Sequence, residues 1–157
     1  MIFVCVGSRE YQFNRLLKKL DELAAQGKLD DEVFAQIGQS EYEPKHFPWV
    51  RYMDRDAFQK HRMDADLIIS HAGTGALIGA IKLEKQVIAV PRLAKYQEHI
   101  DDHQTQIADV LSGEGYLRQV LDMEELEQTI RLARTAPITK RYERPSNVLQ
   151  LIEDFLG

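Results

Sequence analysis

Short apolar runs alternate with amphipathic segments along the chain. Continuous apolar runs bounded by glycine or proline are typical of strands that are buried on both faces of a sheet. Between them, apolar residues recur at intervals of about three or four, which is typical of helices with one buried side. The runs predict strands at 2–6, 33–37, 49–53, 67–69, 86–90 and 116–120. The amphipathic segments predict helices at 16–24, 54–63, 74–83, 100–111, 122–133 and 146–155.

This order of strands and helices predicts the fold class. Alternating strands and helices form parallel sheets, so we expect an α/β fold with a Rossmann-like parallel sheet and helices on both faces. The 157 residues suffice for one domain with a substantial core. No internal repeat or linker divides them, so the sequence predicts a single domain, 1–157.

Composition narrows the functional classes. The net charge of −5 gives no general reason to bind nucleic acid, and the lone Cys5 excludes a disulfide framework. No segment approaches the ~20 apolar residues that span a bilayer. The first residues, MIFVCVGS, indicate a strand and not a signal peptide, because no basic region precedes the apolar run. We therefore expect a cytoplasmic protein.

The most informative motif is SHAGTG, at 70–75, between a predicted strand and a predicted helix. Gly73 and Gly75 remove side chains where the backbone turns, so the first N–H groups of the helix face outward with the positive end of its dipole. Thr74 adds a hydroxyl donor. Ligands of parallel sheets bind at the carboxyl ends of the strands, so this loop predicts a phosphate or diphosphate site. A tight turn that merely requires glycine is the alternative.

Two further motifs permit other interpretations of the same region. The glycines at 73, 75 and 79 resemble a dinucleotide fingerprint, which would indicate a nicotinamide-dependent oxidoreductase. We weigh this lower, because the motif follows the fourth strand and no acidic residue stands ~20 residues later. Asp64 and Asp66 form a D-x-D that could hold a metal, but their place before a strand favours helix termination.

Histidines and basic residues offer weaker signals. His99 and His103 have a zinc-ligand spacing without a third ligand, so a polar loop that contacts the ligand is favoured. Ser70-His71 lacks the flanking glycines of a hydrolase nucleophile. A basic stretch indicates a solvated face, with an anionic membrane or an acidic partner as the alternative; its members are Arg131, Arg134, Lys140, Arg141 and Arg144.

Three stretches resemble one family closely: VGSREYQFNRLLKKLDELA, VFAQIGQSEYEPKHF and ADLIISHAGTGALIGAIKLEKQVIAVPRLAKYQEHIDDHQTQIADVL. It is the C-terminal-domain family of family 28 glycosyltransferases. The chain looks most like its free-standing members, the soluble subunits of two-component UDP-sugar transferases. These include bacterial exopolysaccharide and capsule galactosyltransferase subunits and the soluble subunit of the eukaryotic dolichol-linked GlcNAc transferase. The resemblance covers nearly the whole chain.

The resemblance implies a UDP-sugar donor-binding domain, the C-terminal half of a GT-B fold. A membrane-anchored, acceptor-binding subunit would be the partner and would recruit the chain to the cytoplasmic face of the membrane. Together they would move a hexose from a UDP-sugar to a lipid-diphosphate-linked saccharide, with inversion and without a cofactor or bound metal. Isolated from that partner, the chain could form a homodimer. A non-catalytic accessory module that stabilises or enhances a partner transferase is the alternative.

The resemblance also implies which residues form the site. His71 is the one catalytic candidate, although the partner is expected to supply or complete the base. The donor-binding candidates are Gly7, Ser8, Arg9, Ser70, His71, Ala72, Gly73, Thr74, Gly75, Arg92, Glu98, His99, Asp102, His103 and Gln104. The uracil would lie near 39–42 and the chain before the fourth strand. Gly79 stands where many relatives carry a ribose-binding acid, so either another group, such as Glu98, holds the ribose, or nucleotide binding is weak and becomes competent only with the partner.

Overall fold

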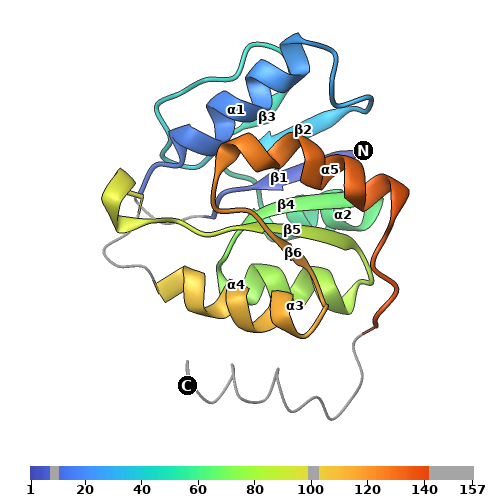
Figure 1. Cartoon of the computed structure of the whole chain (residues 1–157). Helices are drawn as coiled ribbons and strands as arrows, with labels where there is room; N and C mark the ends of the chain where they lie inside the picture. The colour runs from blue at the N-terminus through green and yellow to red at the C-terminus, as the bar shows by residue number, and fades with distance from the viewer. Residues whose placement is uncertain (8–10, 99–102, 142–157) are drawn as a thin grey trace.

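A computed structural model describes residues 1–7, 11–98 and 103–141 and shows a six-stranded, entirely parallel sheet (Figure 1). The strands lie in the order β3-β2-β1-β4-β5-β6. Their bounds are β1 Ile2–Cys5, β2 Val33–Gln36, β3 Trp49–Val50, β4 Leu67–His71, β5 Gln86–Val90 and β6 Arg118–Gln119. This confirms the expected Rossmann-like α/β class.

Helices cover both faces of the sheet (Figure 1). On one face lie α1 (Asn14–Ala25) and α5 (Leu126–Thr135); on the other lie α2 (Arg55–Asp64), α3 (Thr74–Lys82) and α4 (His103–Gly113). Short 3-10 turns, η1 (Ala94–Tyr96) and η2 (Met123–Glu125), follow β5 and precede α5. No helix among the described ranges is long and apolar enough to cross a membrane.

The central strand shows why continuous apolar runs form this sheet. Ile2 and Val4 pack into the core beneath α1 and α5, whereas Phe3 and Cys5 pack toward α3 and α4. All four side chains are buried, because successive residues of a strand point to opposite faces and each face is covered. Burying an apolar side chain of this size contributes about 1.5–3 kcal/mol. Both faces of β1 therefore stabilise the same sheet.

The edge strands are shorter than the sequence predicts. The expected strand 49–53 pairs with β2 only through Trp49 and Val50, because the chain then turns toward the cap of α2. There the Asp54 carboxylate accepts a hydrogen bond from the Ala57 N–H at 2.8 Å, as expected of an N-cap. The expected strand 116–120 pairs with β5 only at Arg118 and Gln119. The helix predicted at 146–155 lies outside the described residues.

The strand order places a topological switch point between β1 and β4. From β1 the chain proceeds through α1 to β2 on one side, whereas β4 continues through α3 to β5 on the other. Loops that leave adjacent strands in opposite directions separate at their carboxyl ends and leave a crevice there. In Figure 1 these ends point to the side where η1 lies. The loop at 70–75 begins at this crevice.

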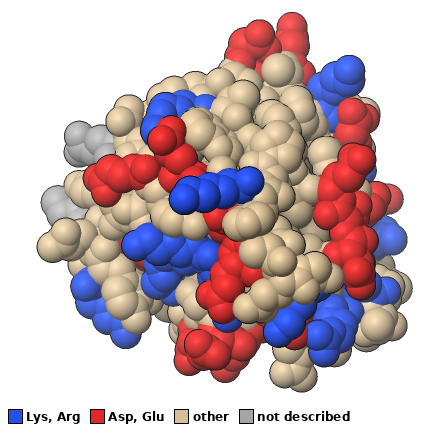
Figure 2. Space-filling view, turned by 90° about the horizontal axis from the view of Figure 1, so that it is seen from above, with Lys and Arg blue, Asp and Glu red and all other residues tan. Residues whose placement is uncertain are grey.

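The face covered by α1 and α5 carries interspersed acidic and basic side chains (Figure 2). A groove of about 560 Å³ runs between these helices, and its charges pair: Lys28 and Arg131 lie 3.3 and 2.6 Å from Glu127. The described members of the basic stretch all have carboxylate neighbours within 4.0 Å, namely Arg131–Glu127, Arg134–Asp31, Lys140–Glu114 and Arg141–Glu84. This pairing fits a solvated face; Arg144 lies outside the described residues.

A buried carboxylate on α1 holds the loop that follows β2. Asp21 is 2% exposed and accepts hydrogen bonds from the Tyr42 hydroxyl at 2.6 Å and the His46 N–H at 2.9 Å. Burial alone would raise the pKa of this carboxyl, but the hydrogen bonds from Tyr42, Lys45 and His46 lower it below its ordinary value of 3.8. The loop is thus attached to α1 by the ionised form of Asp21.

This attachment predicts an acid-sensitive contribution to stability. Because the folded-state pKa of Asp21 is depressed, its contribution is present above the unfolded value of 3.8 and is lost as the pH falls through the lower folded value. Asp21→Asn should therefore lose less unfolding free energy than the wild type between about pH 5 and about pH 2. Urea unfolding across this range checks it, and parallel pH curves for the two proteins would contradict it.

Candidate functional site

A pocket of about 430 Å³ opens at the switch point. Five elements supply its walls: the ends of β1, β2 and β4, the start of α3, and α2 with the chain that leads into it. Its lining residues are Cys5, Gly7, Gln36, Met53, Arg55, Phe58, Arg62, His71, Gly75 and Ala76. Three of the predicted site residues, Gly7, His71 and Gly75, therefore border one cavity.

His71 occupies the centre of this arrangement because two glycines leave room for its ring. A Cβ atom at Gly73 would lie 2.2 Å from the His71 Cε1, and one at Gly7 would lie 2.8 Å from its Nε2. Gly7 also has a φ of +84°, which residues with side chains rarely adopt. The sequence explained Gly73 by the approach of a diphosphate, whereas here the space serves the imidazole. By contrast, a Cβ at Gly75 would meet nothing within 4 Å.

Gln104, at the start of α4, fixes the tautomer of His71. The Gln104 Oε1 accepts a hydrogen bond from the Arg92 N–H at 3.0 Å, so its amide nitrogen faces the His71 Nδ1 at 3.3 Å. An amide nitrogen can only donate, so Nδ1 is the acceptor and the proton of the neutral ring is on Nε2. The Nε2–H, which lies next to Gly7, is a donor. In this form the ring nitrogen Nε2 can donate a hydrogen bond and cannot accept a proton.

The first turn of α3 adds further donors. Gly73 is the N-cap of this helix and provides no side-chain hydrogen bond to it, and Gly75 and Ala76 of the first turn line the pocket. Backbone N–H groups at a helix start have no partner within the helix and carry the positive end of its dipole. Ala72 and the neighbouring Ser70 are buried, and the Ser70 hydroxyl donates to the His71 carbonyl at 2.9 Å. Ser70 and Ala72 therefore anchor the loop in the protein interior and do not line the pocket.

Sequence reasoning missed the side of the pocket formed by α2. Arg55 and Arg62 line it together with Met53, and no carboxylate is among its lining residues. No motif identified these residues, because nothing in the spacing of α2 shows that two of its cations face the end of β4. Part of the segment expected to contact the uracil lies near this side of the pocket. The Gln39 amide donates to the Tyr52 hydroxyl at 2.6 Å, and Tyr52 directly precedes Met53, which lines the pocket.

Arg92 and Glu98 are placed differently from the prediction. Arg92 is 2% exposed, and its guanidinium donates to the carbonyls of Val6, Tyr11, Gln12 and Glu98. The Glu98 carboxylate is fully buried and forms a bidentate pair with Arg15, at 2.9 and 3.0 Å. Both charges are satisfied by protein groups, so they shape the loops around the cleft. A direct contact of Arg92 or Glu98 with the donor therefore stays a prediction, and in this structure the partners of both side chains are protein groups.

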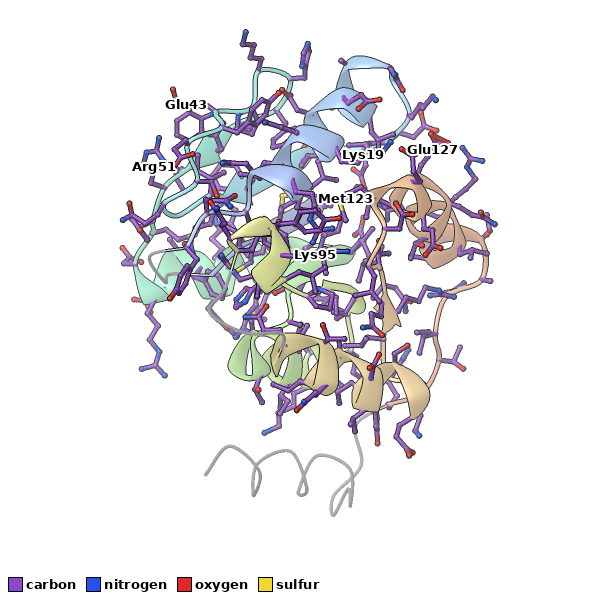
Figure 3. All side chains as sticks on the ribbon, turned by 60° about the vertical axis from the view of Figure 1, so that its left-hand side comes forward. Lys19, Glu43, Arg51, Lys95, Met123 and Glu127 are labelled. Carbon is purple, nitrogen blue, oxygen red and sulfur yellow. The ribbon has the colours of Figure 1, made fainter. Side chains whose placement is uncertain are left out.

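The remaining candidates divide between described and undescribed segments. Ser8, Arg9, His99 and Asp102 lie outside the described residues, and His103 is described only as the first residue of α4. Another hollow, of about 680 Å³, lies on the β5–β6 side of the same edge. Lys95 and Met123 border it from η1 and η2 (Figure 3).

The D-x-D motif forms no metal cluster among the described residues, whereas His99 of the histidine pair lies outside them. Asp66 precedes β4 at the amino end of the sheet, where Arg134 lies 3.5 Å from its carboxylate. This agrees with the interpretation that the D-x-D ends a helix far from the cleft. Among the described residues, no group of three or more His, Cys, Asp or Glu side chains could hold a metal ion.

A six-stranded parallel sheet in this strand order, with helices on both faces, defines a Rossmann-like α/β class of domain. The family model of the glycosyltransferase family 28 C-terminal domain matches residues 1–154. The chain belongs to this family. The resemblance that the sequence suggested is confirmed at that level.

Curated relatives include subunits of one transferase. The chain is 32% identical over 69 residues to the UDP-N-acetylglucosamine transferase subunit ALG13 of Cryptococcus neoformans var. neoformans serotype D, covering 43% of this chain and 32% of that protein. It is 40% identical over 53 residues to the Saccharomyces cerevisiae ALG13 subunit, covering 34% of this chain and 24% of that protein. The match thus spans about a third or less of these relatives.

Solved structures share the fold. The chain superposes on an ALG13 solution structure with a TM-score of 0.59 and 20% identity, covering 99% of this chain and 94% of that one. For the Acinetobacter baumannii MurG crystal structure the TM-score is 0.59 and the identity 21%, over 99% and 48% of the two chains. For the kitacinnamycin glycosyltransferase the values are 0.62 and 16%, over 87% and 36%. At these identities the likeness establishes the fold alone.

The Arg92 network predicts a stability effect. Arg92→Met removes a guanidinium that binds four buried or partly buried carbonyls, and those carbonyls lose their donor. We expect a loss of about 3 kcal/mol in unfolding free energy, measured by urea denaturation. The matched control is Lys95→Met in the same loop, whose exposed ammonium should change stability by less than about 0.5 kcal/mol. Equal effects would contradict a structural role for Arg92.

The glycine loop predicts a contrast between neighbouring substitutions. Gly73→Ala places a methyl group against the His71 ring, so we expect a cost of about 1–3 kcal/mol and shifted imidazole resonances. Gly75→Ala points into open space and should keep both the stability and the resonances of the wild type. Thermal unfolding and imidazole NMR spectra compare the two. Unchanged His71 resonances in Gly73→Ala would refute the packing explanation.

Proposed function

We propose that the chain is the donor-binding subunit of a two-component inverting glycosyltransferase. The observation that carries this proposal is the pocket at the switch point, where His71, the start of α3 and two arginines supply donors and cations without any carboxylate. Such a lining suits the diphosphate of a UDP-sugar. Membership of family 28 and the names of the ALG13 relatives support the same assignment.

In the proposed reaction an acceptor hydroxyl attacks the anomeric carbon of the sugar in a single displacement. The new glycosidic bond forms as the bond to UDP breaks, and UDP departs with the electron pair. The His71 Nε2–H and the N–H groups of Gly75 and Ala76 would stabilise the charge on that leaving group. His71 is thus a catalytic candidate as a donor, and a base in the partner takes the hydroxyl proton.

The partner and setting are also part of the proposal. A membrane-anchored subunit would bind the lipid-diphosphate-linked acceptor and bring this chain to the cytoplasmic face of the membrane. The transferred group would be a hexose, and the product an exopolysaccharide or capsule precursor. The ALG13 relatives are named as subunits, which supports a division of labour between two polypeptides. Without that partner, the chain could associate with a second copy of itself.

The alternative function is a non-catalytic accessory module that stabilises or enhances a partner transferase. The observation that favours it is the lack, among the residues that line the pocket, of a carboxylate that could serve as a base or hold a ribose. An accessory module would need the surface that contacts the partner but would not need the pocket for its function. The two functions therefore differ in whether pocket substitutions matter.

Calorimetric titration with UDP tests the proposal. The chain should bind UDP, should not bind nicotinamide dinucleotides, and should lose UDP binding in Gly73→Val, whose side chain displaces His71. His71→Ala should weaken UDP binding by about tenfold, the value of a hydrogen bond to a charged group. A fully active complex with Gly73→Val, or absence of UDP binding both to the folded wild type and to its complex with the partner, would reject the donor site in favour of the accessory module.

A further inference from the structure

Arg62 of α2 fills a space that α3 leaves open at Gly79. A Cβ atom at Gly79 would lie 2.4 Å from the Arg62 Nη1 and 3.2 Å from its Cζ, so the two positions exclude each other. The guanidinium lies over the Phe58 ring at 5.1 Å, and its Nη2 donates to the Gln59 Oε1 at 2.7 Å. Glycine at 79 thus leaves room for the Arg62 guanidinium in the position that it occupies.

The charge of Arg62 is poorly compensated among the described residues. Its Nε is buried and has no hydrogen-bond partner there, and no carboxylate lines the pocket. Burial lowers the pKa of the Arg62 guanidinium and raises that of the nearby Cys5 thiol, so the thiol stays neutral and supplies no countercharge. Arg55 adds a second cation to the same lining. A half-buried cation that has no carboxylate beside it is stabilised by a bound anion.

We infer that Arg62, whose guanidinium occupies the space beside Gly79, binds a phosphate group of the nucleotide. This inference rests on the proposed function, because it takes the occupant of the pocket to be a nucleoside diphosphate. A guanidinium has only donors and matches the geometry of phosphate oxygens in a bidentate contact. The nucleotide is then held by a cation from α2 instead of a carboxylate from α3, and affinity depends on its phosphates.

NMR titration of the full chain with UDP and with uridine tests this dependence. Arg62→Gln should weaken UDP binding by about tenfold or more and change uridine binding by less than about twofold. The matched control is Lys60→Gln, which removes the same charge from an exposed position of α2 and should leave UDP binding unchanged. Raising the salt concentration should weaken UDP binding more in the wild type than in Arg62→Gln.

Gly79→Ala provides a second, independent variant. The added methyl displaces the Arg62 guanidinium without altering the charge of the protein, and alanine suits a helix better than glycine, so the fold is retained. UDP binding should weaken to nearly the same extent as in Arg62→Gln. In the Arg62→Gln background, Gly79→Ala should cost little more, because the group that it displaces is already gone.

The outcomes separate the inference from the proposed function. If the wild type binds UDP and both Arg62→Gln and Gly79→Ala bind it equally well, the inference is overturned and Arg62 only packs between α2 and α3. If neither the folded wild type nor its complex with the partner binds UDP at millimolar concentration, the proposed function is rejected and the inference is rejected with it. The inference and the proposed function are both supported if each variant loses affinity for UDP but not for uridine, and if the double variant binds UDP about as well as Arg62→Gln alone.

Discussion

The guanidinium of Arg92 determines how the loops at the carboxyl edge of the sheet are arranged. Arg92 follows β5, yet its guanidinium binds carbonyls just after β1, in the loop between β1 and α1, and at Glu98. A buried cation is tolerated only when its donors are used, so these backbone segments must stay where they are. The backbone N–H of the same residue holds Gln104, and Gln104 in turn fixes the His71 ring. The geometry of the cleft therefore depends on one arginine that never faces it.

The cleft joins two kinds of polar group with different functions. Arg15 pairs with the Glu98 carboxylate, and Arg92 donates to backbone carbonyls, including that of Glu98, so these groups give the loops a fixed shape. On the α2 and α3 side, by contrast, the described pocket lining is cationic and contains no acid. Charges that are paired in the protein support structure, while an uncompensated charge at a cavity favours a ligand of opposite sign. This contrast indicates which side of the cleft is suited to a phosphate-containing ligand.

Much of the site was predictable from sequence because glycine and strand endings leave a clear local signal. The loop at 70–75 begins where expected, and it brings His71 and Gly75 to one cavity with Gly7. The reason for Gly73 was only partly foreseen, since the space it leaves is filled by the imidazole. Gly79 stands where many relatives carry an acidic side chain, but the sequence contains no sign that the Arg62 guanidinium occupies the space beside this glycine. That contact joins α2 to α3, and no periodicity within either helix encodes it.

The sequence by itself determined the α/β class, the strands and helices of the central sheet, and the loop that carries the candidate chemistry. These follow from local periodicity and from the positions of glycine, which act within a few residues. The tertiary structure alone decided the shortness of β3 and β6, the burial of Arg92 and Glu98, and the direction of Arg62. Long polar side chains reach partners from distant parts of the chain, so the same arginine can stabilise a loop or face a ligand. Which of these it does depends on the groups that folding brings around it.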